Sequence, residues 1–502
     1  MELKKILDKI SYTEIKNSNE NLIINGVTID SNKVRPNDIF ICIRGNNTDG
    51  HNFAYEAYKN GANAIICDHF LENINSVQII VEDTQKALIE VSNVFYDYPS
   101  HHVKVLAVTG TNGKTTVSHI LQHILEQNGE KCGLIGTLGY KTSLEDCYHP
   151  THNTTPQANE LQSILNQVRL YGSKYCVFEA SSHSIEQNRI GGIDIEIAMF
   201  TNLTQDHLDY HITMHNYFEA KAKLFKNLKK GKCAVINADD KYAKDFIHVI
   251  QDGVNIITYG VNSEDVKVKA YDIEFHDDYT EYKLKVDKSL LKNGENNEID
   301  LKIKLSGLFN VYNSLCAISG AIGLGIDLKT IKERIEKVLP VRGRFEIVNT
   351  NPLVIVDYAH TPDGLENVLK AASALKKDVT QKLICLFGCG GDRDATKRPK
   401  MGKIADELAD MVVITSDNPR SENPDVIISD ILTGIKTMDN KRIFVETDRK
   451  QAIEFIPKIA KTNDIIVIAG KGHETYQILK DKTIHFDDRE IAQSVFPQMS
   501  MR

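Results

Sequence analysis

The segment 105–118, VLAVTGTNGKTTVS, has the residue types and spacing of a loop that binds phosphate. Its apolar start predicts a strand, and the glycines that follow let backbone N–H groups approach an anion at the start of the next helix. Lys114 would reach the β- and γ-phosphates of a triphosphate, and the hydroxyl of Thr115 or Thr116 would bind Mg²⁺. Val108 stands where the common pattern has glycine. We expect nucleotide contacts from the residues Gly110, Thr111, Asn112, Gly113, Lys114, Thr115 and Thr116.

Other polar residues follow apolar stretches that predict strands. Glu179 ends one such stretch, where a carboxylate is otherwise unfavourable, so we expect it to bind Mg²⁺. Near the C-terminus, four polar sequences each come directly after a predicted strand: DYAHTPDG, GCGGDRD, SDNPRSENP and GKGHE. Because open α/β sheets bind ligands at the carboxyl ends of their strands, these sequences predict one cleft.

Composition and charge exclude several classes of protein. The chain has 502 residues, of which 41% are hydrophobic and 25% charged, as in a globular protein. The net charge of −8 gives no basic excess for nucleic acid. No apolar run approaches the ~20 residues that a membrane span needs, and the N-terminal MELKKILDKI predicts an amphipathic helix rather than a signal peptide.

The nine cysteines are scattered, and most lie in apolar stretches. Cys385 and Cys389 are four residues apart, but no second Cys or His pair completes a zinc set. Reduced, buried thiols and a cytoplasmic location are therefore expected.

The length predicts about three domains, at roughly 150 residues each. We expect an α/β protein with domains at 1–101, 102–340 and 341–502. The first is a smaller α/β domain. The second has a mostly parallel sheet of the type that carries a phosphate loop. A polar antiparallel addition is expected over 262–304. The third alternates strands and helices as a Rossmann-like sheet does.

These sequences together resemble the Mur ligase family. The motifs are 110–116, Glu179-Ala-Ser-Ser-His183, TNLTQDHLDYH over 201–211 and Asp357-Tyr-Ala-His360, and the likeness runs from Asp30-Ser31 to GKGHE over 470–474. Members join amino acids to a UDP-muramoyl precursor of bacterial peptidoglycan. The resemblance implies domains for the UDP-substrate, ATP and the incoming amino acid. It also implies that ATP phosphorylates a carboxylate, which an amine then attacks.

The resemblance also implies roles for single residues. His207 would be a second protein ligand of Mg²⁺, and Lys221 would be carbamylated to help hold a second Mg²⁺, with Lys223 as the competing position. Nucleotide contacts would come from Asn310, Arg344 and Asp357, with His360 nearby. The UDP-substrate would contact Ser31, Thr154, Thr155, Ser181, Gln187 and Arg189.

The sequence Asp417-Asn418-Pro419-Arg420 bears on the third substrate. In the subfamily that adds the third peptide residue, DNPR accompanies meso-2,6-diaminopimelate, and relatives that add lysine usually lack this arginine. Diaminopimelate has a carboxylate at its far end, which Arg420 can bind with its planar fork, whereas lysine has only an ammonium there. Arg393 would hold the near carboxylate and Glu474 the far ammonium, with Gly470 leaving room.

We therefore expect an ATP- and Mg²⁺-dependent monomer that adds diaminopimelate to UDP-N-acetylmuramoyl-L-alanyl-D-glutamate through an acyl phosphate. The first alternative is an L-lysine-adding ligase of the same family, separated by position 420. A folate-type glutamate ligase shares the phosphate loop but lacks the Asp30-Ser31 domain and DNPR. A nucleotide-binding regulatory ATPase would leave Arg393, Arg420 and Glu474 without a role.

Overall fold

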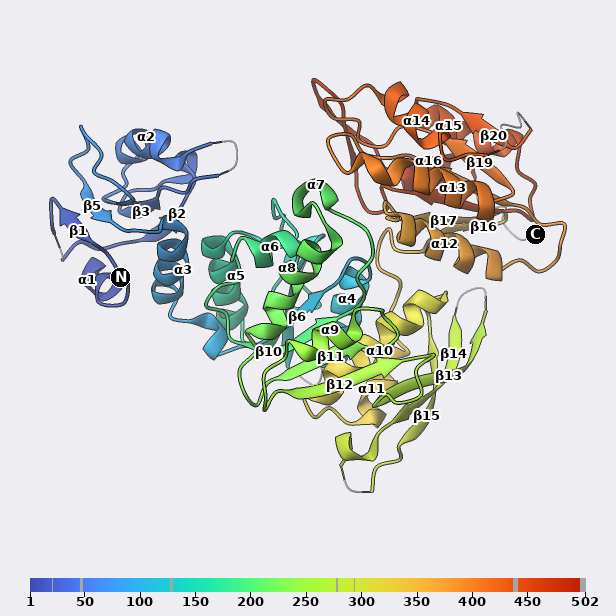
Figure 1. Ribbon diagram of the computed structural model, residues 1–502, viewed down its shortest axis with the longest axis horizontal. Helices are drawn as coiled ribbons and strands as arrows, with labels where there is room; N and C mark the ends of the chain where they lie inside the picture. The colour runs from blue at the N-terminus through green and yellow to red at the C-terminus, as the bar shows by residue number, and fades with distance from the viewer. Residues whose placement is uncertain are drawn as a thin grey trace. The chain divides into compact units, whose positions relative to one another are not determined.

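The computed structural model describes residues 1–19, 21–45, 48–126, 130–276, 279–292, 294–436 and 441–496 (Figure 1). They form two compact units, one made of Met1–Ala107 with Leu125–Glu196 and the other of Val108–Ile124 with Ile197–Arg502. Within the described residues, no helix combines the length and the apolar sequence that crossing a bilayer requires.

The first unit begins with a five-stranded sheet in the order β1-β5-β4-β3-β2. Its strands are β1 (Glu14–Lys16), β2 (Gly26–Thr28), β3 (Asp38–Ile41), β4 (Ala64–Cys67) and β5 (Val77–Ile80). Strands β2 to β5 are parallel, and β1 is antiparallel to β5. Successive residues of β4 point to opposite faces, so Ile66 packs in the core with α3 (Thr84–Phe95) and Ile65 in the core with α2 (Ala54–Lys59).

The same unit contains strands of the predicted central domain. β7 (Lys131–Gly136) pairs in parallel with β9 (Ser173–Glu179) and antiparallel with β8 (Gly139–Lys141). Helices α5 (Ala158–Leu170) and α6 (Ser182–Glu186) flank β9 in the chain. Because 176–178 are fully buried, β9 carries Glu179 to the carboxyl end of the strand inside the protein.

The second unit opens where β6 (Lys104–Thr109) runs into the phosphate loop and α4 (Lys114–Leu125). The strands that follow in the chain are β10 (Ile195–Phe200), β11 (Cys233–Asn237), β12 (Asn255–Gly260), β13 (Val268–Phe275), β14 (Thr280–Val286) and β15 (Glu298–Ile303). β10 to β13 pair in parallel, whereas β14 and β15 add antiparallel. The mostly parallel central sheet and its antiparallel addition are as predicted, and alternate residues of β14 are buried.

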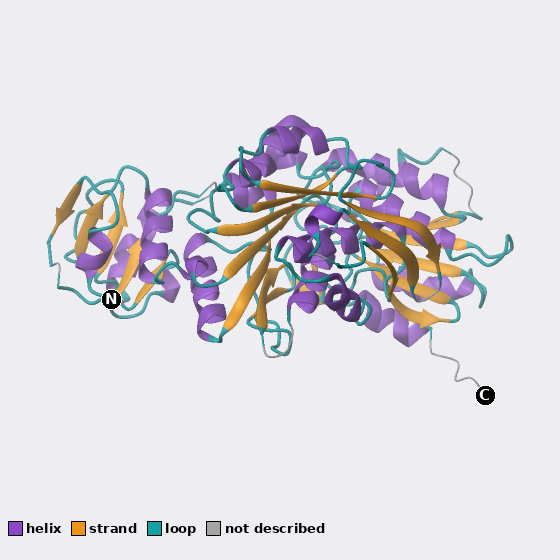
Figure 2. Ribbon diagram, turned by 90° about the horizontal axis from the view of Figure 1, so that it is seen from below, coloured by secondary structure: helices purple, strands orange, loops and turns teal. Residues whose placement is uncertain are grey.

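The second unit also holds a six-stranded sheet in the order β16-β17-β21-β18-β19-β20. Its strands are β16 (Glu346–Thr350), β17 (Leu353–Asp357), β18 (Leu383–Phe387), β19 (Met411–Ile414), β20 (Ile443–Val445) and β21 (Ile465–Ala469). All pairs are parallel except β16 with β17. Helices α12 (Pro362–Ala374), α13 (Arg398–Leu408) and α14 (Pro424–Leu432) pack in one core, and α15 (Arg449–Phe455) and α16 (Asp488–Val495) in the other, so both faces are covered (Figure 2).

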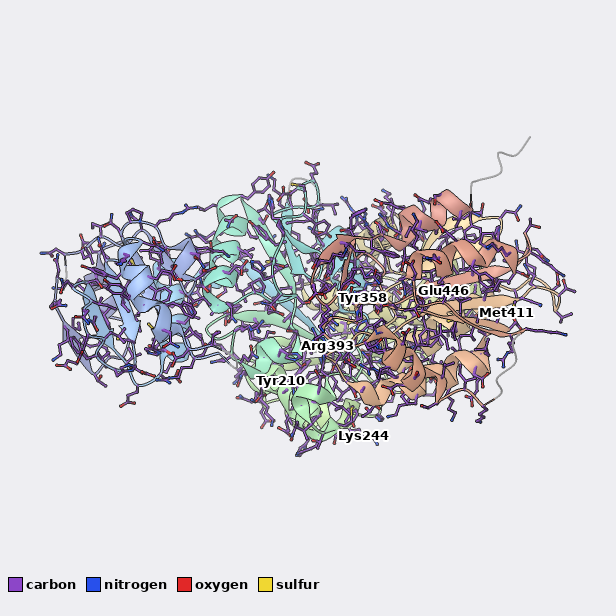
Figure 3. All side chains as sticks on the ribbon, turned by 90° about the horizontal axis from the view of Figure 1, so that it is seen from above. Tyr210, Lys244, Tyr358, Arg393, Met411 and Glu446 are labelled. Atoms are coloured by element: carbon purple, nitrogen blue, oxygen red, sulfur yellow. The ribbon has the colours of Figure 1, made fainter. Side chains whose placement is uncertain are left out.

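The four polar sequences predicted to share a cleft follow β17, β18, β19 and β21, which are parallel neighbours. Their carboxyl ends therefore meet at one edge of the sheet. Figure 3 shows Tyr358, after β17, and Arg393, after β18, on the side away from Met411, which begins β19.

Candidate functional site

The phosphate loop depends on glycine at two positions. Gly110 has φ +153° and Gly113 has φ +87°. A Cβ at Gly110 would lie 1.9 Å from Thr201 Oγ1, and one at Gly113 would lie 2.3 Å from Asn313 Oδ1. The loop is also tied to the chain after β10, because the Thr201 hydroxyl donates to the Asn112 carbonyl at 2.6 Å. The backbone is thus held in the tight turn that exposes N–H groups at the start of α4.

Two lysines converge on this loop. Lys114 Nζ donates to the carbonyls of Gly110 and Thr111, both at 2.9 Å. Lys221, on α8 (Met214–Lys226), is only 1% exposed, and its Nζ donates to the Gly110 carbonyl at 2.9 Å. Burial, together with the charge of Lys114, holds the pKa of Lys221 well below its usual range. Lys223 on the same helix is half-buried rather than buried, so Lys221 is the lysine that reaches the loop.

Tyr217 lies between Lys221 and His207. The Lys221 ammonium is 4.8 Å from the centre of the Tyr217 ring, and the His207 ring is 6.2 Å from it, edge-on. The Tyr217 hydroxyl is 3.2 Å from Thr111 Oγ1, which fixes the ring against the loop.

Asp206, the buried neighbour of His207 in the chain, lies close to three basic side chains. Its carboxylate lies 3.3 Å from His207 Nε2 and 3.8 Å from both His360 Nε2 and Lys397 Nζ. Although burial raises the pKa of Asp206, these neighbours lower it below its usual range. Burial lowers the pKa of His360 to about 4, so this imidazole is neutral at neutral pH.

A cavity of about 310 Å³ opens beside the loop and is lined by Asn112, Gly113 and Thr116. Arg344 and Asp357 line its other side. Arg344 donates to Thr115 Oγ1 at 3.1 Å and stacks over Tyr358, 4.5 Å from the ring centre. Burial raises the pKa of Asp357 in spite of the nearby Arg344 guanidinium. The cavity therefore has the polar lining that a nucleotide needs, with a guanidinium at its phosphate end.

Asn310 does not line that cavity. It borders a second one of about 720 Å³, to which Arg344 also contributes. Its side chain is used inside α10 (Leu308–Gly323), where the amide donates to the Ser306 carbonyl at 2.8 Å and accepts from Asn313 at 3.1 Å. Asn313, one turn further on, is the α10 asparagine that faces the nucleotide cavity.

In the first unit, Glu179 and the predicted UDP-substrate residues form one network. The Glu179 carboxylate accepts from the Thr137 backbone N–H at 2.9 Å and from its hydroxyl at 3.0 Å, and Thr137 Oγ1 lies 3.3 Å from Thr154 Oγ1. A Cβ at Gly136 would lie 2.2 Å from Glu179 Oε1, so glycine leaves room for the carboxylate.

The Thr155 hydroxyl links this network to the start of α6. It donates to the Glu179 carbonyl at 2.7 Å and accepts from the Ser181 backbone N–H at 3.1 Å. Arg189 donates to the Thr155 carbonyl at 3.1 Å and to Gln187 Oε1 at 2.9 Å. Thus Thr154, Thr155, Ser181, Gln187 and Arg189 lie together in one hydrogen-bonded network.

Ser31 does not join these contacts. It lies after β2, and its hydroxyl donates to Glu56 Oε2 at 2.9 Å. The Asn60 amide donates to its carbonyl at 2.9 Å. In this structure the Ser31 side chain therefore ties the turn after β2 to helix α2.

Most of the residues predicted to bind the incoming amino acid lie at the carboxyl edge of the six-stranded sheet. Asn418 Nδ2 donates to Glu474 Oε2 at 2.9 Å, and Arg420 donates to the Gly391 carbonyl at 2.8 Å. A Cβ at Gly470 would lie 3.3 Å from Asp417 Oδ2, so this glycine keeps space beside the carboxylate. Burial raises the pKa of Glu474, and the charge of Asp417 raises it further.

Arg420 and Arg393 differ in how firmly they are held. Arg420 has φ +54° and its backbone N–H donates to the Ile478 carbonyl at 3.1 Å, so Pro419 and Arg420 turn sharply there. Arg393 is exposed, and its guanidinium donates to the neighbouring Asp392 carbonyl at 2.8 Å. The Arg420 guanidinium is thus bonded to a different segment of the chain, whereas the Arg393 guanidinium is bonded to the residue next to it.

Oxygen and imidazole donors near the phosphate loop fit a magnesium ion. The Thr115 hydroxyl, at the start of α4, and the His207 imidazole both lie in the second unit. Hydroxyl and carboxylate oxygens are the ligands that Mg²⁺ prefers, and it keeps several waters besides. These residues could hold the ion, which would neutralise phosphate charge.

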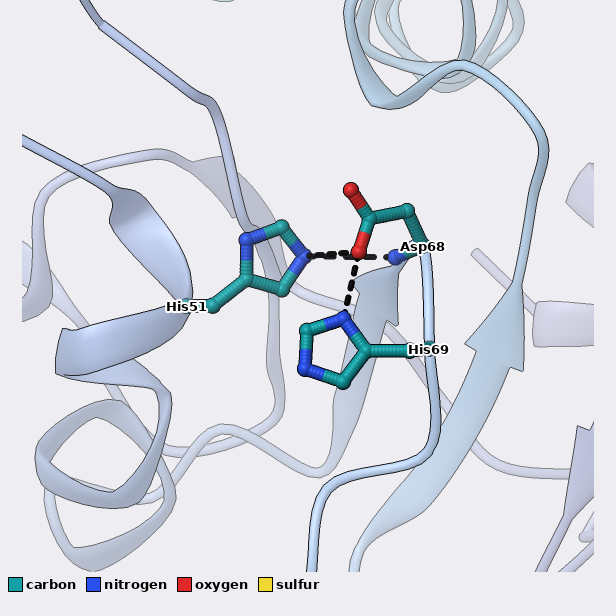
Figure 4. Close-up of side chains that lie close together, drawn as sticks. All are labelled: His51, Asp68 and His69. Carbon is teal, nitrogen blue, oxygen red and sulfur yellow. Dashed lines mark hydrogen bonds and ion pairs between the residues drawn. The ribbon is translucent and has the colours of Figure 1, made fainter.

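Another His and Asp cluster, of His51, Asp68 and His69, lies at the end of β4 (Figure 4). Asp68 donates its backbone N–H to His51 Nε2 at 3.2 Å, and its Oδ1 lies 2.5 Å from His69 Nδ1. Arg44 donates to Asp68 Oδ2 at 2.9 Å and, through this hydrogen bond, holds the pKa of Asp68 below its usual range. Protein groups already occupy the lone pairs that a metal would need, so the cluster fastens the segment before His51 to β4.

Sequence reasoning missed several residues of these sites. Thr137 follows β7, and Asp206 precedes His207 within a quoted motif. Lys471 is a buried cation inside GKGHE, and Asn313 lies one turn after Asn310. Thr137 could have been found because it follows a strand, and Asp206 and Lys471 because they lie in motifs with charged residues. The sequence alone could not show which of Asn310 and Asn313 lines the cavity.

The three-domain fold and the phosphate loop are those of ATP-dependent ligases that form amide bonds, as the similarities to known proteins show. Three family models match in succession: "Mur ligase family, catalytic domain" at 23–99, "Mur ligase middle domain" at 108–321 and "Mur ligase, glutamate ligase domain" at 343–472. The chain belongs to the Mur ligase family.

Two relatives and one solved structure that match nearly the whole chain carry the same name. The chain is 44% identical over 507 residues to a Clostridium botulinum protein named UDP-N-acetylmuramoyl-L-alanyl-D-glutamate–2,6-diaminopimelate ligase, covering 99% of this chain and 100% of the relative. A Bacillus velezensis protein of the same name is 42% identical over 501 residues, covering 98% of each. A solved structure with this name has a TM-score of 0.67 at 33% identity, covering 99% of this chain and 98% of that one.

A Thermotoga maritima MurF ligase solved in complex with ADP has a TM-score of 0.66 at 18% identity, over 95% of this chain and 98% of that one, and shows that the fold is shared.

Proposed function

We propose that this chain adds meso-2,6-diaminopimelate to UDP-N-acetylmuramoyl-L-alanyl-D-glutamate, with ATP as the energy source. A carboxylate of the D-glutamate residue attacks the γ-phosphorus of ATP, giving an acyl phosphate and ADP. The amine of diaminopimelate then attacks the acyl carbon, loses a proton and expels inorganic phosphate. The names of the full-length relatives support this reaction.

Each substrate is assigned to one of the three groups of residues described above: the phosphate loop with its cavity, the network around Thr155, and the carboxyl edge of the six-stranded sheet. The phosphate loop and its cavity would bind ATP, with Lys114 on the terminal phosphates and Arg344 beside Thr115. The network of Thr154, Thr155, Ser181, Gln187 and Arg189 would bind the muramoyl dipeptide, where hydroxyl and amide groups suit a sugar and Arg189 suits an anion. We retain Ser31 as a contact of the uridine diphosphate and Asn310 and Asp357 as nucleotide contacts.

Mg²⁺ would be held by Thr115, Glu179 and His207, and would supply positive charge where ATP and the substrate carboxylate meet. We propose that Lys221 carries a carbamate. Burial lowers the pKa of Lys221 and so raises the share of neutral amine, which is the form that can add to CO₂ with release of a proton. The carbamate anion would then join the ligand set of a second Mg²⁺.

The choice of diaminopimelate depends on one observation, the position of Arg420. Its guanidinium is fixed against the Gly391 carbonyl at 2.8 Å, at the same sheet edge as Asn418 and Glu474. A far-end carboxylate would pair with Arg420 and a far-end ammonium with Glu474. Lysine would leave the guanidinium unpaired. Arg393 is assigned to the near carboxylate, with Asp417, Pro419 and Gly470 shaping the pocket.

A lysine-adding ligase of the same family is the remaining alternative. It is tested by offering diaminopimelate and L-lysine together, with ATP, Mg²⁺ and the UDP-dipeptide, and weighing the product. We expect the mass of the diaminopimelate tripeptide, with phosphate release that requires both the UDP-dipeptide and the amino acid. Equal use of both amino acids would overturn the specificity, and phosphate release without either substrate would favour a regulatory ATPase.

We further propose that the chain acts as a cytoplasmic monomer with domain boundaries near 101 and 340. All nine cysteines are free thiols, which agrees with a reducing compartment.

A further inference from the structure

Lys471 places a buried cation under the proposed diaminopimelate site. It follows Gly470 at the end of β21, and its side chain is 0% exposed. Its Nζ donates to Asn418 Oδ1 at 3.1 Å and to Glu474 Oε2 at 3.0 Å, and lies 3.6 Å from Asp417 Oδ1. A buried ammonium is costly unless it is paired, so these contacts define its place.

The contacts of Lys471 leave one specific oxygen free for a ligand. Glu474 Oε2 accepts from both Lys471 and Asn418, whereas no hydrogen bond within the described residues reaches Glu474 Oε1. Asp417 Oδ1 is buried and lacks a hydrogen bond among the described residues. Glu474 Oε1 is thus available for a group that donates hydrogen bonds, whereas the buried Asp417 Oδ1 lies near the Lys471 ammonium.

Arg393 is exposed and is assigned to the near carboxylate, so it is left out of the charges around Glu474. Those charges balance only when Lys471 is counted. Asp417 and Glu474 contribute two negative charges, and Lys471 and Arg420 contribute two positive ones. The Arg449 guanidinium also faces Glu474, but its own charge is paired with Asp488 at 2.7 Å. Tyr358 and Tyr476 are the other titratable neighbours of Glu474. Without Lys471, two adjacent carboxylates would face one arginine, and the site would attract a guest with net positive charge.

We propose that Lys471 is a positioning residue that sets the choice of amino acid. It holds Glu474 with one oxygen directed to the ligand and makes the site neutral. The site then accepts a far end with both an ammonium and a carboxylate, and rejects one with an ammonium alone. This inference rests on the proposed function, because it assumes that the incoming amino acid binds at this edge.

The test compares kcat and KM for diaminopimelate and for L-lysine in the wild type, Lys471→Met, Glu474→Gln and the double variant. We expect Lys471→Met to raise the KM for diaminopimelate about tenfold or more and to raise the lysine-to-diaminopimelate ratio of kcat/KM by a similar factor. The KM for ATP should stay within about twofold. The double variant removes one charge of each sign, so its lysine-to-diaminopimelate ratio of kcat/KM should return part of the way to the wild-type value.

A pH profile separates this role from a merely structural one. Lys471 opposes the rise in the pKa of Glu474 that burial and Asp417 cause. In Lys471→Met the pKa of Glu474 should therefore rise further, and the increase in KM on acidification should begin at a higher pH than in the wild type. Lys471→Arg should keep the wild-type profile. Lys376→Met is the control, because Lys376 pairs with Asp410 at the amino end of β19.

The outcomes separate the inference from the proposed function. Wild-type enzyme that shows no diaminopimelate-dependent turnover overturns both. Wild-type turnover with diaminopimelate, combined with an unchanged amino-acid ratio and pH profile in Lys471→Met, overturns the inference alone. If Lys471→Met does not fold, Lys471→Gln replaces it, since the amide still donates to Asn418 and Glu474 without the charge, and the same two readouts decide.

Discussion

The Arg344 guanidinium donates a hydrogen bond of 3.1 Å to the Thr115 hydroxyl, across 229 residues of sequence. Thr115 begins the helix after the phosphate loop, whereas Arg344 lies just before β16 of the six-stranded sheet. The contact therefore brings the Arg344 cation from the six-stranded sheet to the phosphate loop, beside the cavity proposed for the nucleotide.

Arg344→Lys should weaken nucleotide binding without unfolding the chain. Lysine keeps the charge but cannot donate to Thr115 and stack over Tyr358 with one planar group. We expect the Kd for ATP, measured by calorimetry, to rise about tenfold. Arg342→Lys is the matched control, since Arg342 pairs with Asp487 at 2.8 Å instead. Equal losses in the two variants would contradict a specific role for Arg344.

Lys114→Ala should abolish turnover. The Lys114 ammonium lies against the loop carbonyls of Gly110 and Thr111, from which a rotation of the side chain brings it to a bound triphosphate. We expect kcat to fall about 10³-fold or more, because the charge on the transferred phosphoryl group loses its cation. Phosphate release measures the loss, and thermal unfolding checks that the fold persists. Wild-type-like turnover would refute the assignment of the phosphate loop.

Lys221→Ala should be inactive, whereas Lys223→Ala should remain near the wild type. The two lysines share helix α8, but only Lys221 is buried against the Gly110 carbonyl. Its lowered pKa favours the neutral amine that can add to CO₂. ¹³C-bicarbonate should therefore produce a carbamate signal in the NMR spectrum of the wild type and of Lys223→Ala, but not of Lys221→Ala. The same signal in all three proteins would exclude Lys221 as its source.

The sequence predicted the sheets better than the details of the sites. The apolar stretches before DYAHTPDG, GCGGDRD and GKGHE are the buried strands β17, β18 and β21, as predicted, because continuous apolar runs between polar turns define them. The strands β16 and β20 were not predicted, because they lie at the two edges of the sheet and are only partly buried.

Contacts between distant segments could not be predicted in the same way. Nothing local distinguishes Asn310, whose amide serves its own helix, from Asn313, which lines the nucleotide cavity. The burial of Lys471 depends on strands β19 and β21 being near each other through β18. Such features follow from tertiary packing, which one sequence does not reveal.

Arg420→Lys should impair the amino-acid step selectively. The arginine is fixed by the Gly391 carbonyl at 2.8 Å, so a shorter point charge would lose the fork that a far-end carboxylate requires. We expect the KM for diaminopimelate to rise about tenfold while the KM for ATP changes less than about twofold. Arg442→Lys is the control, because Arg442 pairs with Asp406 at 2.7 Å, away from this edge. A parallel rise in the KM for ATP would argue against a role confined to the amino acid.

Asp239→Asn should destabilise the chain in a pH-dependent way. The Asp239 carboxylate accepts from the backbone N–H groups of Val261, Asn262 and Ser263 and from the Tyr312 hydroxyl. Although burial raises its pKa, these hydrogen bonds lower the pKa to about 2. Its folded-state pKa is below the unfolded one, so the stabilisation is present above about pH 4 and is lost as the pH falls toward 2.

Urea unfolding at several pH values measures this effect. At pH 7 the wild type should be more stable than Asp239→Asn by about 1 kcal/mol, a value discounted for the partial exposure of the carboxylate. That difference should shrink between about pH 4 and pH 2, because protonation removes the charge that the asparagine never had. A difference that is constant across this range would mean that the loop depends on the shape of the side chain and not on its charge.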